Sequence, residues 1–371
     1  MRPTPIRDQY REIVLQMRAK LIPERQIAQE LGIGRSTVQR IVRDHRKELG
    51  DKGIDVDCTK GVSTYYKATE SEPARWVKTD NKLTNVKEFI NEALEQFKGQ
   101  IEPINPRPFE GHSDEDLLSL YVITDYHFGM QSWAGETGET WDIETARQTL
   151  INWFSQAIKS APNSKVGIFC NLGDFIHFDS LLPVTPANRH VLDAAGKLPE
   201  IMQAIIEIMR TIIEMLLDKH EIVHIIWAEG NHDEATSVLM RAMYADKYKN
   251  EPRVTVDNSH IPYYAYEWGM TSLFFHHGHK RNPSNVTEAL VAHFRDLFGR
   301  TQWSYAHTGH MHHKHVKENG MMIIEQHQTL SAKDSYAVRG GYNSHRAADV
   351  ITYHKLHGEV SRLTIKPEIV N

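Results

Sequence analysis

The chain has 371 residues, of which 40% are apolar and 25% charged, so it has the length of two domains and the composition of an ordinary globular protein. Its net charge of −5 gives the whole chain no signature of nucleic-acid binding, and its two cysteines are too few for a disulfide framework or a thiolate metal site. No apolar run reaches the roughly 18 residues of a membrane span, and residues 1–9 lack the apolar segment of a secretory signal. We therefore expect a cytoplasmic protein without a membrane partner.

Residues 1–50 differ from the rest of the chain in charge, because they carry 11 Lys or Arg against 6 Asp or Glu. Apolar residues at helical spacing predict a first helix over residues 7–21 and a second, shorter helix over 24–31 that ends at Gly32. A third helix is expected to begin near Ser36. Its inner face would carry the apolar residues Val38, Ile41 and Val42. These features predict a small all-α domain.

Residues 24–43 resemble the general helix-turn-helix family in their spacing of small and apolar positions. The residues that carry the resemblance are Ile27, Ala28, Leu31, Gly32, Ile33, Val38 and Ile41. The resemblance implies that the third helix enters the major groove of DNA. The side chains then expected to contact bases and phosphates are Arg35, Ser36, Thr37, Gln39 and Arg40. A three-helix protein-interaction module is the alternative, and the local basic charge favours nucleic acid.

Residues 51–114 give weaker signals, and we assign them to a linker region. Two short segments, 63–67 and 74–78, could pair as a hairpin, and residues 85–97 have a helical pattern. Three prolines within residues 101–111 indicate a semi-rigid connection. We therefore expect the last domain to begin near residue 115.

Strands alternate with helices in residues 115–371, which predicts a layered α/β fold. In chain order we expect strand 117–124, helix 143–160, strand 165–172, helix 199–220 and strand 221–228. Later strands are expected at 272–275, 321–325, 349–355 and 360–366. The methionines of the second helix lie at helical spacing among isoleucines, so we interpret them as core residues.

Five short segments each supply oxygen or nitrogen groups that bind metals, and most of them follow an expected strand. They contain Asp125 with His127, Asp174 with His177, Asn231 with His232, His277, and His310 with His312. Open α/β sheets place their sites at the carboxyl ends of strands. The i, i+2 pairs Asp125/His127 and His310/His312 would put both side chains on one side of an extended chain. This donor set contains no thiolate and suits Mn²⁺, with Fe²⁺ or Zn²⁺ as alternatives.

The order of these motifs, D-x-H, G-D-x-x-H, G-N-H-D, H-G-H and G-H-x-H, resembles that of the calcineurin-like metallophosphoesterase family over about residues 117–366. The resemblance implies a metallophosphoesterase-type layered α/β sandwich that holds two metal ions. One ion would be held by Asp125, His127 and His312. The other would be held by Asn231, His277 and His310, with Asp174 bridging the two. His232 would be the catalytic histidine, oriented by Asp233.

Two divalent ions roughly 3.5–4 Å apart would activate a water and stabilise the attacking and leaving oxygens of a phosphoester. His232, which is not used as a ligand, could donate a proton or a hydrogen bond to the leaving oxygen, and Asp233 would help to keep it positively charged. The remaining histidines near the motifs are expected beside the ligands or at the surface. They are His276, His279, His307, His313 and His315.

The first two motifs look more like the DNA-repair exonuclease branch of the family than the protein-phosphatase branch, whose arginine-containing second motif is absent here. His177 could therefore contact substrate instead of metal. Three arginines, Arg189, Arg339 and Arg346, could approach a substrate phosphate, with solvated surface as the alternative.

The leading functional hypothesis is a two-metal-dependent phosphodiesterase or nuclease that acts on DNA, to which the helix-turn-helix recruits it. One alternative is a phosphatase or phosphodiesterase that acts on a nucleotide or a phosphoprotein. Another is a DNA-binding or assembly protein whose phosphoesterase fold is largely structural, although the complete set of ligands argues against it. Helix-turn-helix modules often dimerise, so a homo-oligomer is a further expectation.

Overall fold

The computed structural model describes most of the chain. The described residues are 6–19, 24–51, 62–66, 75–79, 105–106, 108–186, 189–281 and 283–370. Contacts within the chain group it into two compact units, Met1–Glu92 and Ala93–Asn371. The domain boundaries expected from the sequence, 1–50, 51–114 and 115–371, stay predictions.

The first unit contains the three expected helices, α1 (Ile6–Ala19), α2 (Glu24–Leu31) and α3 (Arg35–Asp51). A small apolar core holds them together, because one face of each helix contributes buried side chains to it. The buried residues are Val14, Ile27, Ala28, Val38 and Ile41. The turn between α2 and α3 is closed by the backbone N–H of Ile33, which donates to the carbonyl of Ala28 at 3.0 Å. The sequence-based expectation of an all-α module is confirmed.

Strands β1 (Val62–Tyr66) and β2 (Arg75–Thr79) form the expected hairpin. They pair antiparallel, with Val62 opposite Thr79 and Tyr66 opposite Arg75. The helix expected at residues 85–97 lies outside the described residues, and so do residues 101–104 and 107 of the proline-containing segment.

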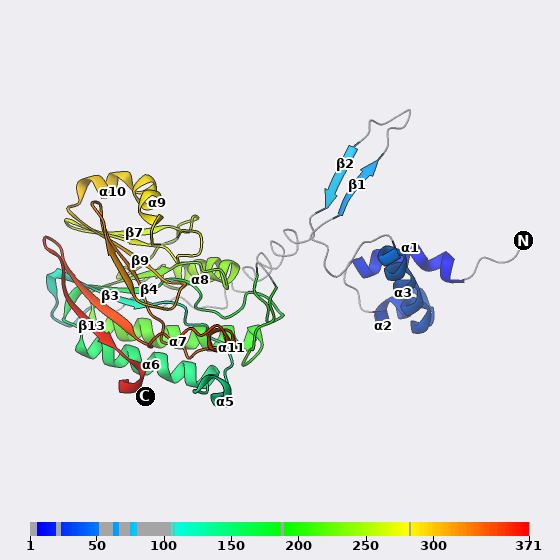
Figure 1. Ribbon diagram of the computed structural model, residues 1–371, viewed down its shortest axis with the longest axis horizontal. Helices are drawn as coiled ribbons and strands as arrows, with labels where there is room; N and C mark the ends of the chain where they lie inside the picture. The colour runs from blue at the N-terminus through cyan, green and yellow to red at the C-terminus, as the bar shows by residue number, and fades with distance from the viewer. Residues whose placement is uncertain are drawn as a thin grey trace, which may run out of the picture. The chain divides into compact units, whose positions relative to one another are not determined.

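The second unit is built on two stacked sheets (Figure 1). The six-stranded sheet has the order β13-β12-β3-β4-β5-β6. Its strands are β3 (Asp114–Ile123), β4 (Ser164–Asn171), β5 (Ile222–Trp227), β6 (Val254–Val256), β12 (Ala348–His354) and β13 (Gly358–Ile365). Strands β3 to β6 run parallel, and β12 pairs antiparallel with both β3 and β13.

The five-stranded sheet has the order β10-β11-β9-β8-β7. Its strands are β7 (Tyr264–Trp268), β8 (Thr271–Phe275), β9 (Trp303–Thr308), β10 (His315–Glu318) and β11 (Ile323–Gln326). The central strands β8, β9 and β11 are parallel, and the edge strands β7 and β10 are antiparallel to their neighbours. The sequence did not indicate β7, β9 or β10.

The alternation of side chains along β3 explains how the layers are held together. Leu118 and Leu120 face the second sheet, where they pack with residues such as Leu273. Tyr121 and Ile123 face the opposite side and pack against helices. Because successive side chains point to opposite faces of a strand, a continuous apolar run fills two separate cores.

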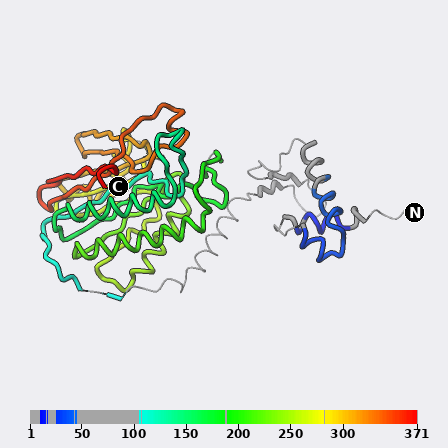
Figure 2. Tube along the Cα trace, turned by 90° about the horizontal axis from the view of Figure 1, so that it is seen from below, coloured from blue at the N-terminus to red at the C-terminus, as the bar shows by residue number. Residues whose placement is uncertain are grey.

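Helices cover both outer faces of the stacked sheets. Helices α6 (Ile143–Ser160) and α7 (Leu198–Lys219) lie side by side over the six-stranded sheet (Figures 1 and 2). Helices α9 (Val286–His293) and α10 (Arg295–Arg300) cover the five-stranded sheet. The layered α/β sandwich expected from the sequence is confirmed, and the methionine-containing helix α7 is a core helix.

The remaining helices are α5 (Ala134–Thr137), α8 (Glu234–Lys247), α11 (Ser335–Arg339) and α12 (Pro367–Val370). Of these, α8 is the one that the sequence should have revealed, because its buried residues Leu239, Met240, Met243 and Tyr244 follow helical spacing. Among the described residues, no helix combines the length and apolar character needed to cross a bilayer.

Candidate metal centre

The five ligand-bearing segments follow five different strands and meet at the carboxyl ends of the two stacked sheets. Asp125, Asp174 and Asn231 come after the neighbouring parallel strands β3, β4 and β5. His277 and His310 come after the parallel neighbours β8 and β9 of the facing sheet. Parallel strands place their carboxyl ends at the same edge, so segments far apart in the sequence converge.

The backbone at these segments is strained. Six non-glycine residues in the described chain have a positive φ, and five of them are candidate ligands. These five are Asp125 (50°), His127 (47°), Asp174 (52°), His310 (75°) and His312 (55°). The i, i+2 pairs are therefore not extended, as the sequence had suggested, but lie on left-handed turns. Such strain persists only where the surrounding structure enforces it, and it collects at functional sites.

Two motif glycines allow the ligand segments to approach each other closely. A Cβ at Gly230 would overlap the carboxylate and the backbone nitrogen of Asp174. A Cβ at Gly309 would overlap the side chains of Thr124 and Asp125. The glycines of G-N-H-D and G-H-x-H are thus required by close packing around two carboxylates.

One group of candidate ligands consists of Asp125, His127 and His312, whose ligand atoms all lie within 4.8 Å of one another. Nε2 of His312 lies 3.2 Å from Oδ1 of Asp125 and 3.4 Å from Nε2 of His127. Burial and the neighbouring His232 hold the pKa of His127 well below its usual range. Burial thus favours the neutral form of His127, which is the form in which an imidazole binds a metal.

The second group consists of Asp174, His277 and His310. Nε2 of His277 lies 3.1 Å from Oδ2 of Asp174 and 3.2 Å from Oδ1 of Asn231. It also lies 3.9 Å from Oδ1 of Asp125, so the two groups adjoin. Burial disfavours a charged imidazole, but the carboxylates of Asp174 and Asp125 raise the pKa of His277 to about 9.

The residues present fit divalent metal ions. Oδ1 of Asp125 is buried and makes no hydrogen bond, although the other carboxylate oxygen accepts from Thr124 Oγ1 at 2.6 Å and from the N–H of His310 at 2.8 Å. Contacts with the surrounding backbone orient the candidate ligands. For example, Nδ1 of His277 lies 2.9 Å from the carbonyl oxygen of Leu172. Carboxylate, imidazole and amide donors suit a divalent ion of borderline hardness.

His232 lies beside the first group, and its ring forms a further group with His127 and His177, whose ligand atoms lie within 4.8 Å of one another. Its Nδ1 lies 2.8 Å from the carbonyl of His177, and its backbone N–H donates to Oδ1 of Asp174 at 2.7 Å. The ring of His232 stacks on that of His177 at 5.8 Å and lies 4.8 Å from that of His127. A carbonyl partner at Nδ1 fixes that nitrogen as the donor and leaves Nε2 for chemistry.

Asp233 has a different role from the one expected, because its carboxylate bonds to backbone and not to the ring of His232. It accepts from the N–H groups of Gly230 at 2.9 Å, Asp174 at 3.2 Å, Phe175 at 2.8 Å and Ile176 at 3.2 Å. Burial and the nearby Asp174 raise the pKa of Asp233 to about 7, against the effect of its amide donors. Asp233 thus joins the turn after β4 to the turn after β5, and the carbonyl of His177 orients His232.

A model of the calcineurin-like phosphoesterase family matches residues 118–354, a stretch that contains every candidate ligand. The chain belongs to this family. It is therefore a phosphoesterase by family, and the family uses divalent metal ions. A homeodomain-like model matches residues 5–54, which include the three helices of the first unit. Both resemblances expected from the motifs are confirmed.

Solved structures similar to this phosphoesterase share little sequence with it. A predicted phosphoesterase from Streptococcus pneumoniae is 9% identical over 68% of this chain and 100% of its own, with a TM-score of 0.28. Zinc-bound Vps29 from Entamoeba histolytica is 14% identical over 67% and 99%, with a TM-score of 0.29. A 5'-nucleotidase from Candida albicans is 13% identical over 70% and 53%, with a TM-score of 0.33. No curated protein matches the chain.

The expected substrate-contacting residues of this phosphoesterase lie in different surroundings. His177 is buried, with Nδ1 3.4 Å from Nδ1 of His127. Arg189 is exposed on a left-handed turn, and Arg339 pairs with Glu136 at 3.0 Å. Arg346 lies over the ring of Trp141 at 5.2 Å and donates to the carbonyl of Leu330 at 2.8 Å. Arg339 and Arg346 therefore already serve to hold surface segments together.

A further histidine cluster lies away from the ligands of this phosphoesterase and consists of His307, Glu325 and His327. Nδ1 of His307 lies 2.9 Å from Nε2 of His327. Arg362 donates to both carboxylate oxygens of Glu325 at 2.7 Å, and Lys314 adds a contact at 3.2 Å. We name this the closed cluster, because cations of the chain already neutralise its carboxylate. The sequence pointed to His307 but missed His327, whose position after β11 carries no motif.

The helix-turn-helix presents most of its expected contact residues to solvent. On α3, Arg35, Ser36, Gln39 and Arg40 are exposed and Thr37 is half-buried. Nε of Arg40 donates to the carbonyl of Ser36 at 3.4 Å, so this side chain lies along its own helix. A basic, polar outer face on a helix whose other face is buried is suited to phosphates and base edges.

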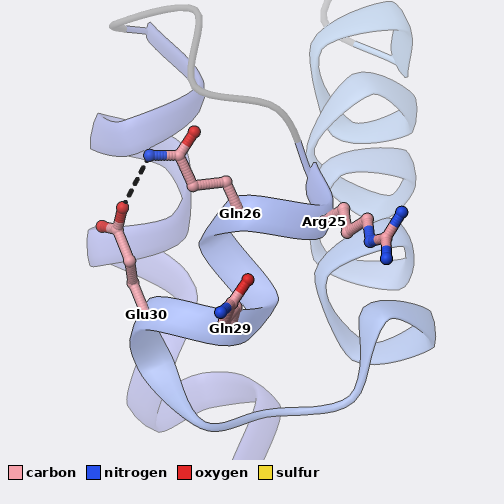
Figure 3. A pocket seen from close by; sticks show the side chains of 4 residues that line it. All are labelled: Arg25, Gln26, Gln29 and Glu30. Carbon is pink, nitrogen blue, oxygen red and sulfur yellow. Dashed lines mark hydrogen bonds between the residues drawn. The ribbon is translucent and has the colours of Figure 1, made fainter.

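A shallow hollow beside α2 has a more mixed character. It is lined by Arg25, Gln26, Gln29 and Glu30 (Figure 3). Nε2 of Gln26 donates to Glu30 at 2.9 Å, whereas Arg25 points away from this pair. One cation and one anion give the hollow no clear preference for an anionic ligand.

Proposed function

We propose that the protein is a two-metal-dependent phosphodiesterase or nuclease that acts on DNA, to which its helix-turn-helix recruits it. One observation carries the proposal. The ligand groups of Asp125 and of Asp174 adjoin, and His232 stands beside them with one ring nitrogen bound to a carbonyl and the other available. A structural role alone would not require two adjoining ligand groups and, beside them, an imidazole whose Nδ1 is held by a backbone carbonyl.

In this proposal Asp125, His127 and His312 hold one ion. Asn231, His277 and His310 would hold the other, and Asp174 would contribute to both. When bound, two divalent ions would polarise the phosphoryl oxygens and provide an activated water. We favour Mn²⁺, with Fe²⁺ or Zn²⁺ as alternatives, because oxygen and imidazole donors without thiolate suit these ions.

The protein's own contribution to catalysis centres on His232. Its Nδ1–H donates to the carbonyl of His177, so a charged ring directs the Nε2 proton to the leaving oxygen. The bond from its backbone N–H to Asp174 ties the catalytic turn to the bridging carboxylate. His177, whose ring stacks on His232, fixes the ring plane and lines the substrate side of the site.

Metal content and turnover should separate Asn231 from its neighbour His232. Asn231→Ala is expected to lower metal occupancy, because it removes a ligand, whereas His232→Ala should keep the metals and lose turnover. Metal analysis by mass spectrometry and Mn²⁺-dependent hydrolysis of bis(p-nitrophenyl) phosphate measure the two quantities. Equal metal loss in both variants would contradict the proposed roles.

A substrate panel with added Mn²⁺ tests the proposed preference for DNA. Single-stranded DNA, duplex DNA, RNA, a cyclic dinucleotide and an aryl phosphate cover the competing substrate classes. Cleavage of DNA that disappears in His232→Ala supports the nuclease. Hydrolysis confined to the cyclic dinucleotide or aryl phosphate would instead favour a small-molecule phosphoesterase.

The role of the helix-turn-helix is tested by the dependence of DNA binding on salt. Arg35→Ala and Arg40→Ala should each reduce the slope of log K against log[salt] by about 1 if the arginine contacts a phosphate. Arg300→Ala, which removes an exposed arginine of the phosphoesterase unit, is the matched control. Unchanged slopes in the two helix variants would favour a protein-interaction module.

A further inference from the structure

A stack of four aromatic rings leads to the metal centre from the side of the five-stranded sheet. His293 stacks on Tyr263 at 4.7 Å, Tyr263 on His276 at 5.0 Å, and His276 on His279 at 5.9 Å, with interplanar angles of 26°, 20° and 8°. The ring of His279 then lies 5.2 Å from that of His277 and 6.3 Å from that of His310. His279 is therefore the innermost ring of the stack, beside the second ligand group.

The two nitrogens of His279 have no hydrogen-bond partner although they are buried. Its side chain is only 7% exposed, and the nearest carboxylate, that of Glu234, lies 3.8 Å from Nε2, which is too far for a hydrogen bond. Glu234 is already paired with Lys280 at 2.8 Å. Buried polar groups are almost always paired, so an unpaired one at a site indicates a partner that arrives with the ligand.

Three other histidines around the centre each have one ring nitrogen with a partner, although Nε2 of His276 also makes no hydrogen bond. Nδ1 of His277 and Nδ1 of His232 both face backbone carbonyls, and Nδ1 of His276 accepts from the N–H of Gly278 at 2.9 Å. Each of these rings is oriented through a nitrogen. The ring of His279 is oriented through its faces instead, and neither nitrogen makes a hydrogen bond, although Nε2 lies at ion-pair distance from Glu234.

We propose that His279 is a further catalytic residue, which hydrogen-bonds to an oxygen of the bound phosphoryl group on the side of His277 and His310. This inference rests on the proposed phosphodiester hydrolysis. His279 does not belong to any of the ligand groups among the described residues, so a substrate contact explains its nitrogens better than a metal does. His232 and His279 then lie beside different ligand groups. His232 lies beside His127 of the first group, and His279 lies beside His277 of the second. A fixed donor at a phosphoryl oxygen stabilises charge that develops in the transition state.

Two substitutions at His279 separate the effect of the ring nitrogens from the effect of the aromatic ring itself. His279→Phe keeps a ring that can stack on His276 but has no polar atom, and His279→Gln restores an N–H donor. We expect His279→Phe to lower kcat for bis(p-nitrophenyl) phosphate by on the order of 10²-fold with unchanged metal content, and His279→Gln to recover part of the loss. Binding of orthophosphate to the metal-loaded protein, measured by calorimetry, should weaken about tenfold in His279→Phe. His260→Phe, at an exposed histidine, is the control.

The outcomes are distinct. If His279→Phe keeps both kcat and phosphate affinity, His279 makes no contact with the phosphoryl group. If both variants lose metal, His279 acts through the ligands and the proposal is wrong. A wild-type protein that binds phosphate and metal but hydrolyses no phosphoester would refute the proposed function, and phosphate affinity alone would then decide on His279. A wild-type protein that binds no phosphate would overturn both.

Discussion

The metal centre and the closed cluster are built from the same types of side chain, histidines and carboxylates, but they serve different purposes. Both gather buried histidines around carboxylates: the closed cluster uses residues within and just after β9 and β11, and the metal centre uses residues after β8 and β9 and after three strands of the six-stranded sheet. In the closed cluster, Arg362 and Lys314 neutralise Glu325. At the metal centre, the ion-pair partners of Asp125 and Asp174 among the described residues are histidines and not Lys or Arg, and Oδ1 of Asp125 has no hydrogen bond. The comparison teaches that the identity of the counter-charge, and not the presence of histidine, separates a binding site from a structural one.

The largest expected effect concerns the bridging carboxylate. Asp174→Asn should lower turnover by on the order of 10³-fold, since it removes charge stabilisation worth several kcal/mol from the centre. The matched change in the closed cluster, Glu325→Gln, should leave kcat close to the wild-type value. Steady-state hydrolysis of an aryl phosphodiester measures both. A comparable loss of kcat in Glu325→Gln would show that the two clusters are not functionally separate.

The second effect concerns stability. Arg362→Met leaves the buried carboxylates of Glu325 and Asp349 without their arginine and should cost about 3 kcal/mol of unfolding free energy. Arg300→Met breaks an exposed pair with Glu267 and should change stability little. Urea denaturation of both variants provides the measurement. The interpretation of a closed cluster fails if the two substitutions cost the same.

Metal removal should distinguish the clusters again. Ions at a concentration of about 100 times Kd stabilise a folded protein by about 2.7 kcal/mol, so EDTA should lower the melting temperature of the wild type. Asp174→Asn should bind less metal than the wild type, and His327→Phe should bind the same amount. Metal analysis after dialysis reports both contents. Loss of an ion in His327→Phe would identify the closed cluster as a metal site.

The smallest expected effect is the pH dependence of the stability that Glu325 contributes. Burial would raise the pKa of Glu325, but His327 and Arg362 lower it from 4.5 to about 2. The unfolded chain therefore binds more protons between these values, so the contribution of Glu325 is complete above pH 4.5 and is lost as the pH falls to about 2. Urea midpoints measured from pH 6 to 3 should fall less steeply in Glu325→Gln. Identical slopes would mean that the pair is not formed.

The sequence was sufficient to single out candidate ligands that the structure brings together, because each lies after a strand in a short motif with a glycine or a histidine. The α/β layers were also predictable, since buried parallel strands such as β4 and β5 are continuous apolar runs. Strand β9 was missed, because its sequence WSYAHT is polar although it is buried between two neighbours. The partners of Asp233 and Arg346 depend on segments far away in the chain, which no local pattern can indicate.

The carboxylate of Asp233 accepts hydrogen bonds from backbone N–H groups of two turns that follow different strands. One turn carries Asp174, and the other carries Asn231 and His232. One carboxylate thus joins the two turns, so that Asp174, the proposed bridging ligand, and His232, the proposed catalytic histidine, are positioned together. Replacing Asp233 would loosen both turns at once, without removing a single atom that touches substrate or metal.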